Sequence, residues 1–178
     1  MQSPIIVKKE EKVYSSHVLD VFKNAVIKSD GKESVFSSAR IRDGVSVLPI
    51  DEKGYAYLID GYYFGIKKRL TATVSGGIDN GEKPLHAAKR ELKEELGIEA
   101  KEWISIGRIV RIPSIVSCSA SLFVAKNLRF GNPHREPDED IRMVKMKFSK
   151  AFEMVLKNRI LDECSSTLIL KAKEILGV

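Results

Sequence analysis

The stretch from Gly76 to Ile98 reads GGIDNGEKPLHAAKRELKEELGI and joins a glycine turn to an acidic helix. Pro84 suits the first helical turn, because its fixed φ is already helical and its missing N–H would have no partner there. Gly97 suits the left-handed residue that ends a helix. At about 100° per residue, one apolar stripe forms from Leu85, Ala88, Leu92 and Leu96. The sequence therefore predicts a helix of roughly three and a half turns between the proline and the second glycine.

Three carboxylates lie on one side of this predicted helix. Glu91, Glu94 and Glu95 fall within an arc of about 100° beside the apolar stripe. Carboxylates crowded at the border of a buried face repel one another and lose solvation, and a hard divalent cation such as Mg²⁺ removes both penalties. Before the helix comes the turn Ser75-Gly76-Gly77, whose glycines have no Cβ to keep the backbone away from a cation or a phosphate. The stretch thus indicates a site for one of these ions.

The helix taken alone also fits a solvated surface helix. Lys89, Arg90 and Lys93 could pair with the acids at helical spacing. Arg90 points away from the apolar stripe, so we expect it to orient a neighbouring carboxylate and to support the site structurally. The positions outside the helix decide between the two interpretations.

These positions match the Nudix box. Gly76 is followed after five residues by Glu82, and seven residues later comes the run Arg90-Glu91-Leu92-Lys93-Glu94-Glu95-Leu96-Gly97-Ile98. The chain therefore resembles the Nudix hydrolases. The resemblance implies Mg²⁺ as cofactor, with Mn²⁺ as a substitute, and catalytic roles for Glu91, Glu94 and Glu95. The metal ligands that it implies are the Ser75 carbonyl, Glu82, Glu91, Glu94 and Glu95.

The reaction implied by the resemblance is hydrolysis of a nucleoside diphosphate linked to another moiety. Cations held by Glu91 and Glu95, with Glu94 in support, neutralise the diphosphate and lower the pKa of a bound water that attacks phosphorus. Glu82 supports the cluster or completes it through water. The candidates for the general base are Glu91, Glu136 and Glu139, of which the last two lie in the loop over residues 134–140.

A weaker resemblance to the ADP-ribose pyrophosphatase branch of this family covers nearly the whole chain. The residues GGIDNGE (76–82) are similar to the branch's Gly-Leu-Ile-Asp-Pro-Gly-Glu turn. Pro113 stands at the place of the branch's marker proline, and the tail around residues 159–162 resembles its ending. The segment before Val45 matches an extension that builds a homodimer with substrate pockets at the subunit boundary. A homodimer acting on ADP-ribose or a related nucleotide sugar is therefore expected.

The sequence departs from this branch where the substrate would be recognised. Residues 71–75 lack its Glu-Leu-Pro-Ala lead, residues 61–64 lack its arginine, and residues 114–119 contain neither the usual glycine nor an acid. A site with fewer polar partners discriminates less, so we expect cleavage of several nucleoside diphosphate derivatives, ADP-ribose among them. The candidate substrate contacts are Gly76, Gly77, Tyr62 and Tyr63. The two tyrosines stack a base or pack in the core or in an interface.

Composition bounds the class of protein. The 178 residues suit one domain with a sizeable core, and a hydrophobic content of 43% is typical of globular proteins. No apolar run approaches membrane-spanning length, and Cys118 and Cys164 give neither a metal spacing nor a disulfide framework. We therefore expect a cytoplasmic protein without a membrane partner. The net charge of +6 suits a phosphate ester, and no aromatic and basic RNA motif points to nucleic acid.

Alternation and turn residues predict the strands. They are expected over residues 5–14, 18–28, 33–41, 45–50, 55–60, 69–74, 103–112, 119–126 and 141–148. Hairpin turns are expected at Ser29–Lys32 and at Asp51–Gly54. Ser149 is expected to cap a helix over 150–157, and Asp162 a helix over 163–176; both belong to the last part of the chain.

Strands around one central helix, with further helices at the end, predict an α/β fold. It is a Nudix-type α/β/α sandwich with a mixed sheet and an N-terminal antiparallel strand extension. Residues 1–41 are expected to form this extension, within the same unit and used for dimerisation. Residues 42–178 are expected to form the Nudix domain.

Three functions remain open from the sequence. The first is a nucleotide-sugar pyrophosphatase. The second is an enzyme for other diphosphates, such as dinucleotides or a capped RNA end. The third is a binding module that kept the box and lost turnover, because acids outside the box are missing at some expected places.

Overall fold

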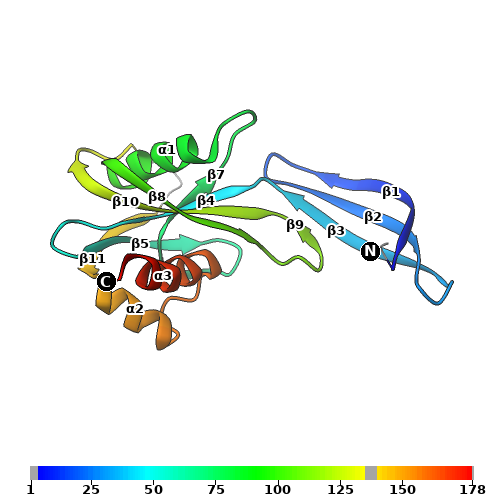
Figure 1. Ribbon diagram of the computed structural model, residues 1–178. Coiled ribbons are helices and arrows are strands. Elements are labelled where there is room, and N and C mark those ends of the chain that lie inside the picture. Colours follow the sequence, from blue (N-terminus) through cyan, green and yellow to red (C-terminus); the bar gives the residue numbers. More distant parts are fainter. Residues whose placement is uncertain (1–3, 135–139, 178) are drawn as a thin grey trace. The chain divides into compact units, whose positions relative to one another are not determined.

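The computed structural model of the protein describes residues 4–134 and 140–177. The chain divides into two compact units. Unit 1 comprises Met1–Asp43 and Val110–Ser119, and unit 2 comprises Gly44–Ile109 and Ala120–Val178. Figure 1 gives the order of the elements along the chain. No helix among the described residues is long and apolar enough to span a membrane.

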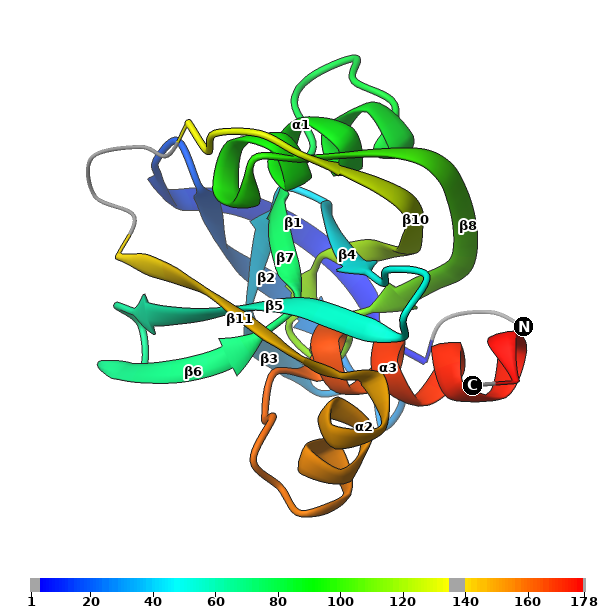
Figure 2. The same ribbon diagram turned by 90° about the vertical axis from the view of Figure 1, so that its left-hand side faces the viewer.

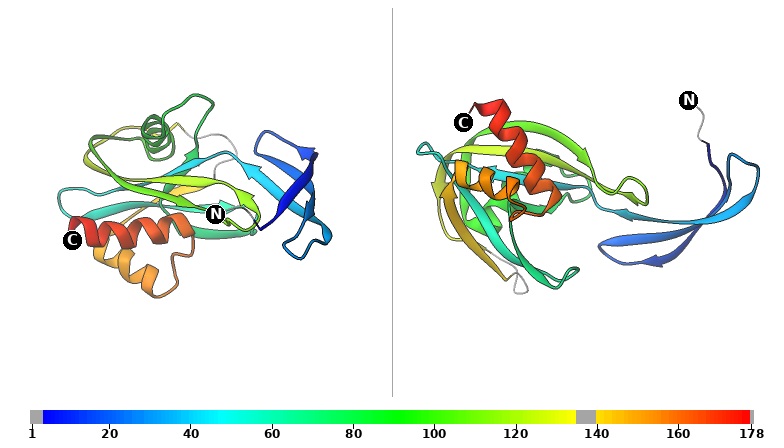
Figure 3. Two further views of the ribbon diagram at one scale, coloured as in Figure 1. Left: turned by 45° about the vertical axis from the view of Figure 1, so that its right-hand side comes forward. Right: turned by 90° about the horizontal axis from the view of Figure 1, so that it is seen from below.

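Unit 1 is built on a four-stranded sheet, in which the predicted N-terminal strands pair antiparallel and a short fourth strand pairs parallel with the third. Its strands are β1 (Ile6–Ser15), β2 (Leu19–Ile27), β3 (Glu33–Ile41) and the short β9 (Val116–Ser117), in the order β1-β2-β3-β9. The first three pair antiparallel, and their twisted sheet is visible in Figure 3. The predicted turn between β2 and β3 is confirmed, with Gly31 at a φ of 78° and its N–H donating to the Lys28 carbonyl at 2.9 Å.

The sheet of unit 1 buries few of its apolar side chains. Phe22 and Val26 are buried, and the Arg40 guanidinium lies 4.2 Å from the centre of the Phe22 ring. Large apolar side chains remain exposed along β1 and β3 and in the connection between β1 and β2. They are Ile6, Val7, Val13, Tyr14, Val18, Val35, Phe36 and Ile41. Unit 1 therefore presents an unusually apolar surface for a strand extension of this size.

Unit 2 contains a mixed sheet and an antiparallel sheet. The mixed sheet has the order β7-β4-β10-β8, formed by Val74–Gly77, Gly44–Pro49, Ser119–Phe130 and Ile98–Val110. In it β4 runs parallel to β10 and antiparallel to β7. The second sheet has the order β11-β5-β6, formed by Ile141–Lys147, Tyr55–Tyr63 and Lys68–Ala72.

Three helices cover the two faces of these strands, as Figure 2 shows. Helix α1 (Pro84–Leu96) lies on one face, and helices α2 (Phe148–Leu156) and α3 (Glu163–Leu176) lie on the other. Successive residues of a strand point to opposite faces of the sheet. In β4, Val47 belongs to the core under α1, and Leu48 belongs to the core under α2 and α3. The predicted α/β/α sandwich with a mixed sheet is confirmed.

The sequence predicted one strand pairing and one continuous strand that the structure does not contain. The turn at residues 51–54 forms, but β4 and β5 enter different sheets and share only an isolated bridge between Ile50 and Ala56. The strand predicted over residues 69–74 is broken at Thr73, whose N–H donates to the Ser165 hydroxyl at 2.9 Å. Because that N–H is used by α3, Thr73 leaves the ladder and the chain passes from one sheet to the other.

The predicted N-cap of α2 was wrong, and the predicted N-cap of α3 is confirmed. Helix α2 begins at Phe148, so Ser149 lies inside it, and the N-cap residue Lys147 makes no side-chain cap hydrogen bond. Helix α3 begins as predicted, with the Asp162 carboxylate accepting from the Ser165 N–H at 2.8 Å. The Phe148 side chain is buried in the core, and this burial sets the start of α2 without a polar cap.

Candidate active site

Both ends of α1 are fixed by the backbone. Pro84 occupies the first turn, and Gly97 ends the helix at a φ of 66°. A Cβ on Gly97 would lie 2.5 Å from the Gly131 carbonyl oxygen, so this glycine also allows the chain after β10 to pass close by. That chain holds the helix end, because the Gly131 N–H donates to the Gly97 carbonyl at 2.7 Å and the His134 N–H to the Glu94 carbonyl at 2.8 Å.

Two carboxylates of α1 lie on its buried side. The predicted stripe packs into the core, with Leu92 and Leu96 fully buried. Glu91 is 8% exposed and Glu95 is 3% exposed, whereas Glu94 is about half exposed at the edge. Burial of an ionised carboxylate is costly unless charge or hydrogen bonds compensate for it. The positions of Glu91 and Glu95 therefore call for cationic partners.

The glycine turn of β7 gives Glu91 its place. Strand β7 pairs with β4, where Gly76 lies opposite Val45 and Ser75 opposite Ser46. A Cβ on Gly76 would lie 1.9 Å from the Glu91 Cδ atom and 2.0 Å from Oε1. The carboxylate thus lies directly against the β7 backbone, in space that any side chain at residue 76 would fill. This contact brings the two halves of the acidic motif together.

Arg90 is the cation that touches this cluster. Its guanidinium donates to Glu91 Oε1 at 2.6 Å and to the exposed Glu94 at 3.2 Å. It also donates to both oxygens of Glu82, at 3.2 and 3.1 Å, and to the Gly77 carbonyl at 2.9 Å. One side chain therefore links the helix, the Glu82 loop and the glycine turn.

The hydrogen bonds of Arg90 shift the pKa values of Glu82 and of Arg90 itself. The hydrogen bond from Arg90 holds the pKa of Glu82 below its usual value, and the Asp79 N–H, which donates to the same carboxylate at 3.0 Å, acts in the same direction. The same hydrogen bonds to Glu82 raise the pKa of Arg90 above its usual value. Glu82 is therefore ionised at neutral pH and fully engaged with Arg90 and the loop backbone.

Tyr62 and Tyr63 face different surroundings. Tyr62 is 50% exposed, and Tyr63 packs against the core under α1. Burial raises the pKa of Tyr63, and the charges of Asp162 and Glu95 raise it further. Tyr63 therefore stands near one buried carboxylate of α1 and the N-cap of α3. The sequence identified Asp162 only as a helix cap, because its proximity to this region depends on the packing of α3.

A buried polar network supports the strand that carries the glycine turn. The Ser46 and Thr73 hydroxyls lie 2.6 Å apart, and Thr73 is 3.0 Å from the Ser165 hydroxyl, which donates to Asp162 at 2.6 Å. All three hydroxyl groups are fully buried. The network fixes the start of β7 to β4 and α3. No local sequence pattern signals it, because its members come from distant segments.

The carboxylates of α1 have the donor chemistry that suits a divalent cation. Among residues 4–134 and 140–177, no three His, Cys, Asp or Glu side chains converge in a ready metal cluster. The missing side chain of Gly76 nevertheless lets the buried Glu91 carboxylate lie against the β7 backbone, and carboxylate oxygens suit Mg²⁺. Glu91 and Glu95 supply carboxylate oxygens of the type that a hard cation takes.

The remaining candidate bases are only partly covered by the structure. Glu136 and Glu139 lie outside the described residues. Asp140, from the same loop, forms an ion pair with Arg69, which also donates to Asp60 at 2.7 Å. Asp140, the acid of this loop that the structure describes, is therefore paired with Arg69 of β6.

Comparison with known proteins places this geometry in a family. A family model of the NUDIX domain matches residues 40–157. The chain belongs to the Nudix family. The acidic helix, the glycine turn and Arg90 all lie within the matched residues, and the protein is a Nudix hydrolase. The predicted membership is confirmed.

Relatives of this Nudix hydrolase include nucleotide-cleaving enzymes. The chain is 25% identical to an ADP-ribose pyrophosphatase of Bacillus subtilis (strain 168) over 155 residues, which is 86% of this chain and 84% of that protein. It is also 25% identical to the methanol dehydrogenase activator of Bacillus methanolicus, over 90% of this chain and 87% of that protein. A crystal structure of an ADP compounds hydrolase superposes with a TM-score of 0.85 at 22% identity, covering 99% of this chain and 96% of that one. This last likeness shows that the fold is shared.

The Gly76 contact yields a testable prediction. Gly76→Ala should lower kcat/KM by about 10²-fold or more, because the new methyl group displaces the Glu91 carboxylate from its position. Steady-state kinetics on the purified variant measure this, with circular dichroism to verify the fold. The matched control is Gly65→Ala, since a Cβ there meets no atom within 4 Å. Equal activity of the two variants would show that the Gly76–Glu91 contact has no part in the site.

Proposed function

We propose that this Nudix hydrolase cleaves a nucleoside diphosphate linked to another moiety, such as ADP-ribose or a related nucleotide sugar, with Mg²⁺ or Mn²⁺ as cofactor. The observation that carries the proposal is the placement of the buried Glu91 carboxylate against Gly76, with buried Glu95 one helical turn away. The name of the Bacillus subtilis relative, ADP-ribose pyrophosphatase, supports the substrate class. A soluble cytoplasmic location accords with it.

Glu91 and Glu95 would hold the cation, with Glu94 and the Ser75 carbonyl as further ligands. A bound divalent cation supplies neutralisation of the diphosphate and a water of lowered pKa. Glu82 supports this set indirectly, because its carboxylate fixes Arg90, and Arg90 in turn donates to Glu91. Arg90 is thus proposed as a positioning residue and not as a catalytic one.

The chain's own groups would carry out the remaining steps. The backbone of Gly76 and Gly77 would approach the substrate phosphates, because neither residue has a side chain in the way. Glu91 would accept the proton of the attacking water; Glu136 and Glu139 are the alternative bases. Tyr63, whose pKa is raised by burial and by the charges of Asp162 and Glu95, is a candidate for a substrate contact. Tyr62, half exposed on the same strand, stays a candidate for stacking a base.

Removal of the charges on α1 should reveal their role. Glu91→Gln and Glu95→Gln should each lower kcat/KM by at least about 10²-fold, because loss of a ligand charge weakens both cation binding and water activation. Activity should be measured over a Mg²⁺ titration, and EDTA should abolish it in the wild type. The matched control is Glu99→Gln, since Glu99 pairs with Lys93 on the surface at 2.7 Å. If both site variants behave like Glu99→Gln, Glu91 and Glu95 are not metal ligands.

Substrate choice can be tested with a panel of diphosphates. We expect Mg²⁺-dependent cleavage of several nucleoside diphosphate derivatives, with ADP-ribose favoured by no more than roughly 10²-fold, because the polar residues that would enforce discrimination are missing. The panel compares kcat/KM for ADP-ribose, other nucleotide sugars, dinucleotide polyphosphates and capped RNA. Near-exclusive cleavage of ADP-ribose would contradict the expected breadth. An absence of cleavage with either Mg²⁺ or Mn²⁺ would favour a binding module.

A homodimer through unit 1 is part of the proposal. Its support is the exposed apolar surface of β1 and β3, since burial of such a surface stabilises association. Sedimentation velocity at micromolar concentration should show a dimer, and Val35→Lys should shift it towards monomer. Leu156→Lys is the control, because Leu156 is an equally exposed apolar residue in unit 2. A monomeric wild type would refute the dimer.

A further inference from the structure

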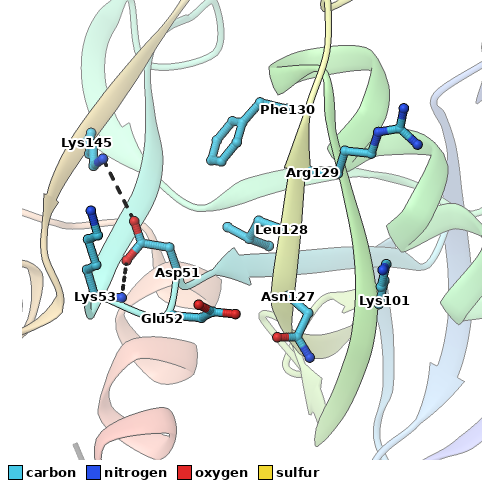
Figure 4. A pocket seen from close by; sticks show the side chains of 9 residues that line it. All are labelled: Asp51, Glu52, Lys53, Lys101, Asn127, Leu128, Arg129, Phe130 and Lys145. Carbon is cyan, nitrogen blue, oxygen red and sulfur yellow. Dashed lines mark hydrogen bonds and ion pairs between the residues drawn. The ribbon is translucent and has the colours of Figure 1, made fainter.

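A groove in unit 2 lies apart from the acidic helix. It has a volume of about 690 Å³ and opens between the turn after β4, the end of β10 and strand β11. Figure 4 shows its lining residues, which are Asp51, Glu52, Lys53, Lys101, Asn127, Leu128, Arg129, Phe130 and Lys145. None of these nine residues belongs to the carboxylate cluster of α1 and Glu82. The groove is therefore a separate feature.

One wall of the groove is apolar and aromatic. Leu128 and Phe130 point from β10 toward the side on which Lys53 and Lys145 lie (Figure 4). The Phe130 ring is 51% exposed, and its centre is 5.0 Å from the centre of the Tyr57 ring. Tyr57 is buried and supports the phenylalanine from within the fold. An exposed ring held in this way offers a rigid surface for a flat ligand.

Cationic side chains outnumber carboxylates in the groove lining, with Lys53, Lys101, Arg129 and Lys145 against Asp51 and Glu52. No carboxylate of a described residue lies within ion-pair distance of Lys53, Lys101 or Arg129. The acid Asp51 is already engaged: it accepts hydrogen bonds from the Tyr55 N–H at 2.8 Å, the Lys53 N–H at 3.0 Å and the Tyr57 hydroxyl at 2.9 Å. Its contact with Lys145 is longer, at 3.8 Å. The groove lining therefore carries a net positive charge.

Contacts within the fold hold the turn at Lys53 and the side chain of Lys145 on β11. The Lys53 carbonyl accepts a hydrogen bond from the Lys147 ammonium at 2.9 Å, which ties the turn to β11. The Lys145 ammonium lies 4.6 Å from the centre of the Tyr55 ring and 5.2 Å from that of Tyr57. The backbone of Lys53 and the ammonium group of Lys145 are thus held by contacts within the fold. Less ordering of these two groups is needed when an anion binds.

We propose that this groove binds a nucleoside phosphate, with the base stacked on Phe130 and the phosphate between Lys53 and Lys145. The proposal does not depend on the reaction proposed for α1. The net positive charge of the lining attracts a phosphate ester, and an aromatic base stacks on the exposed ring. A ligand with only one of these groups leaves half of the groove unused. Arg129 and Lys101, on the other side of β10, add to the positive field around the site.

Binding can be located by NMR on the ¹⁵N-labelled chain. AMP is titrated in the presence of EDTA, because the site at α1 is expected to need a divalent cation. The amides of Lys53, Leu128 and Phe130 should shift and saturate, while those of Gly76 and Gly77 stay in place. Adenosine and ribose 5-phosphate should each bind at least about tenfold more weakly than AMP, since each lacks one of the two groups.

Variants separate this site from general electrostatic attraction. Lys53→Glu and Phe130→Ala should each weaken AMP binding by at least about tenfold, whereas Lys150→Glu should leave it unchanged. Lys150 is exposed, lies outside the groove in α2 and carries the same charge as Lys53. Shifts confined to residues 75–77, or an equal effect of Lys53→Glu and Lys150→Glu, would overturn the proposal. So would an AMP response that does not saturate below about 10 mM.

Discussion

The contact between Gly76 and the Glu91 carboxylate is the constraint on which the site depends. Any side chain at residue 76 would occupy the position of the carboxylate, so helix α1 can approach β7 this closely only because a glycine is there. The approach places a buried negative charge against the strand backbone. Arg90 compensates that charge by donating a hydrogen bond to Glu91. Glu82 accepts hydrogen bonds from Arg90 and from the Asp79 N–H, and these bonds hold Arg90 and the loop in position. The acidic motif is thus one connected structure and not a row of separate acids.

The rest of unit 2 keeps β7 where this contact requires it. The Thr73 N–H donates to the Ser165 hydroxyl of α3 and not to a neighbouring strand. The Ser46 hydroxyl belongs to the same buried network, through its hydrogen bond with the Thr73 hydroxyl. Because a buried polar group is costly unless it is paired, the three hydroxyl groups specify one arrangement of β4, β7 and α3. The network leads to Asp162, whose charge acts on Tyr63 together with that of Glu95. Support of the fold and definition of the site are therefore combined in the same residues.

Positive charge in this protein is used in two ways. Arg90 is satisfied within the carboxylate cluster, where it serves neighbouring groups of the same chain. Lys53 and Arg129 instead border an open groove beside an exposed phenylalanine, without a carboxylate partner among the described residues. The net charge of +6 alone does not distinguish these roles. Only the distances between side chains separate a charge that stabilises the fold from one that is available to a ligand.

The sequence by itself determined the features that depend on neighbours along the chain. These are the register of α1, the cap by Asp162, the left-handed Gly97 and the grouping of Glu91, Glu94 and Glu95 on one side of a helix, because helical periodicity and capping act within a few residues. Tertiary structure decided which segments meet. It broke the strand at Thr73, separated β4 from β5, brought Tyr63 near Glu95 and Asp162, and formed the groove around Phe130. Those outcomes depend on hydrogen bonds and packing between residues far apart in sequence, and local patterns carry no information about such contacts.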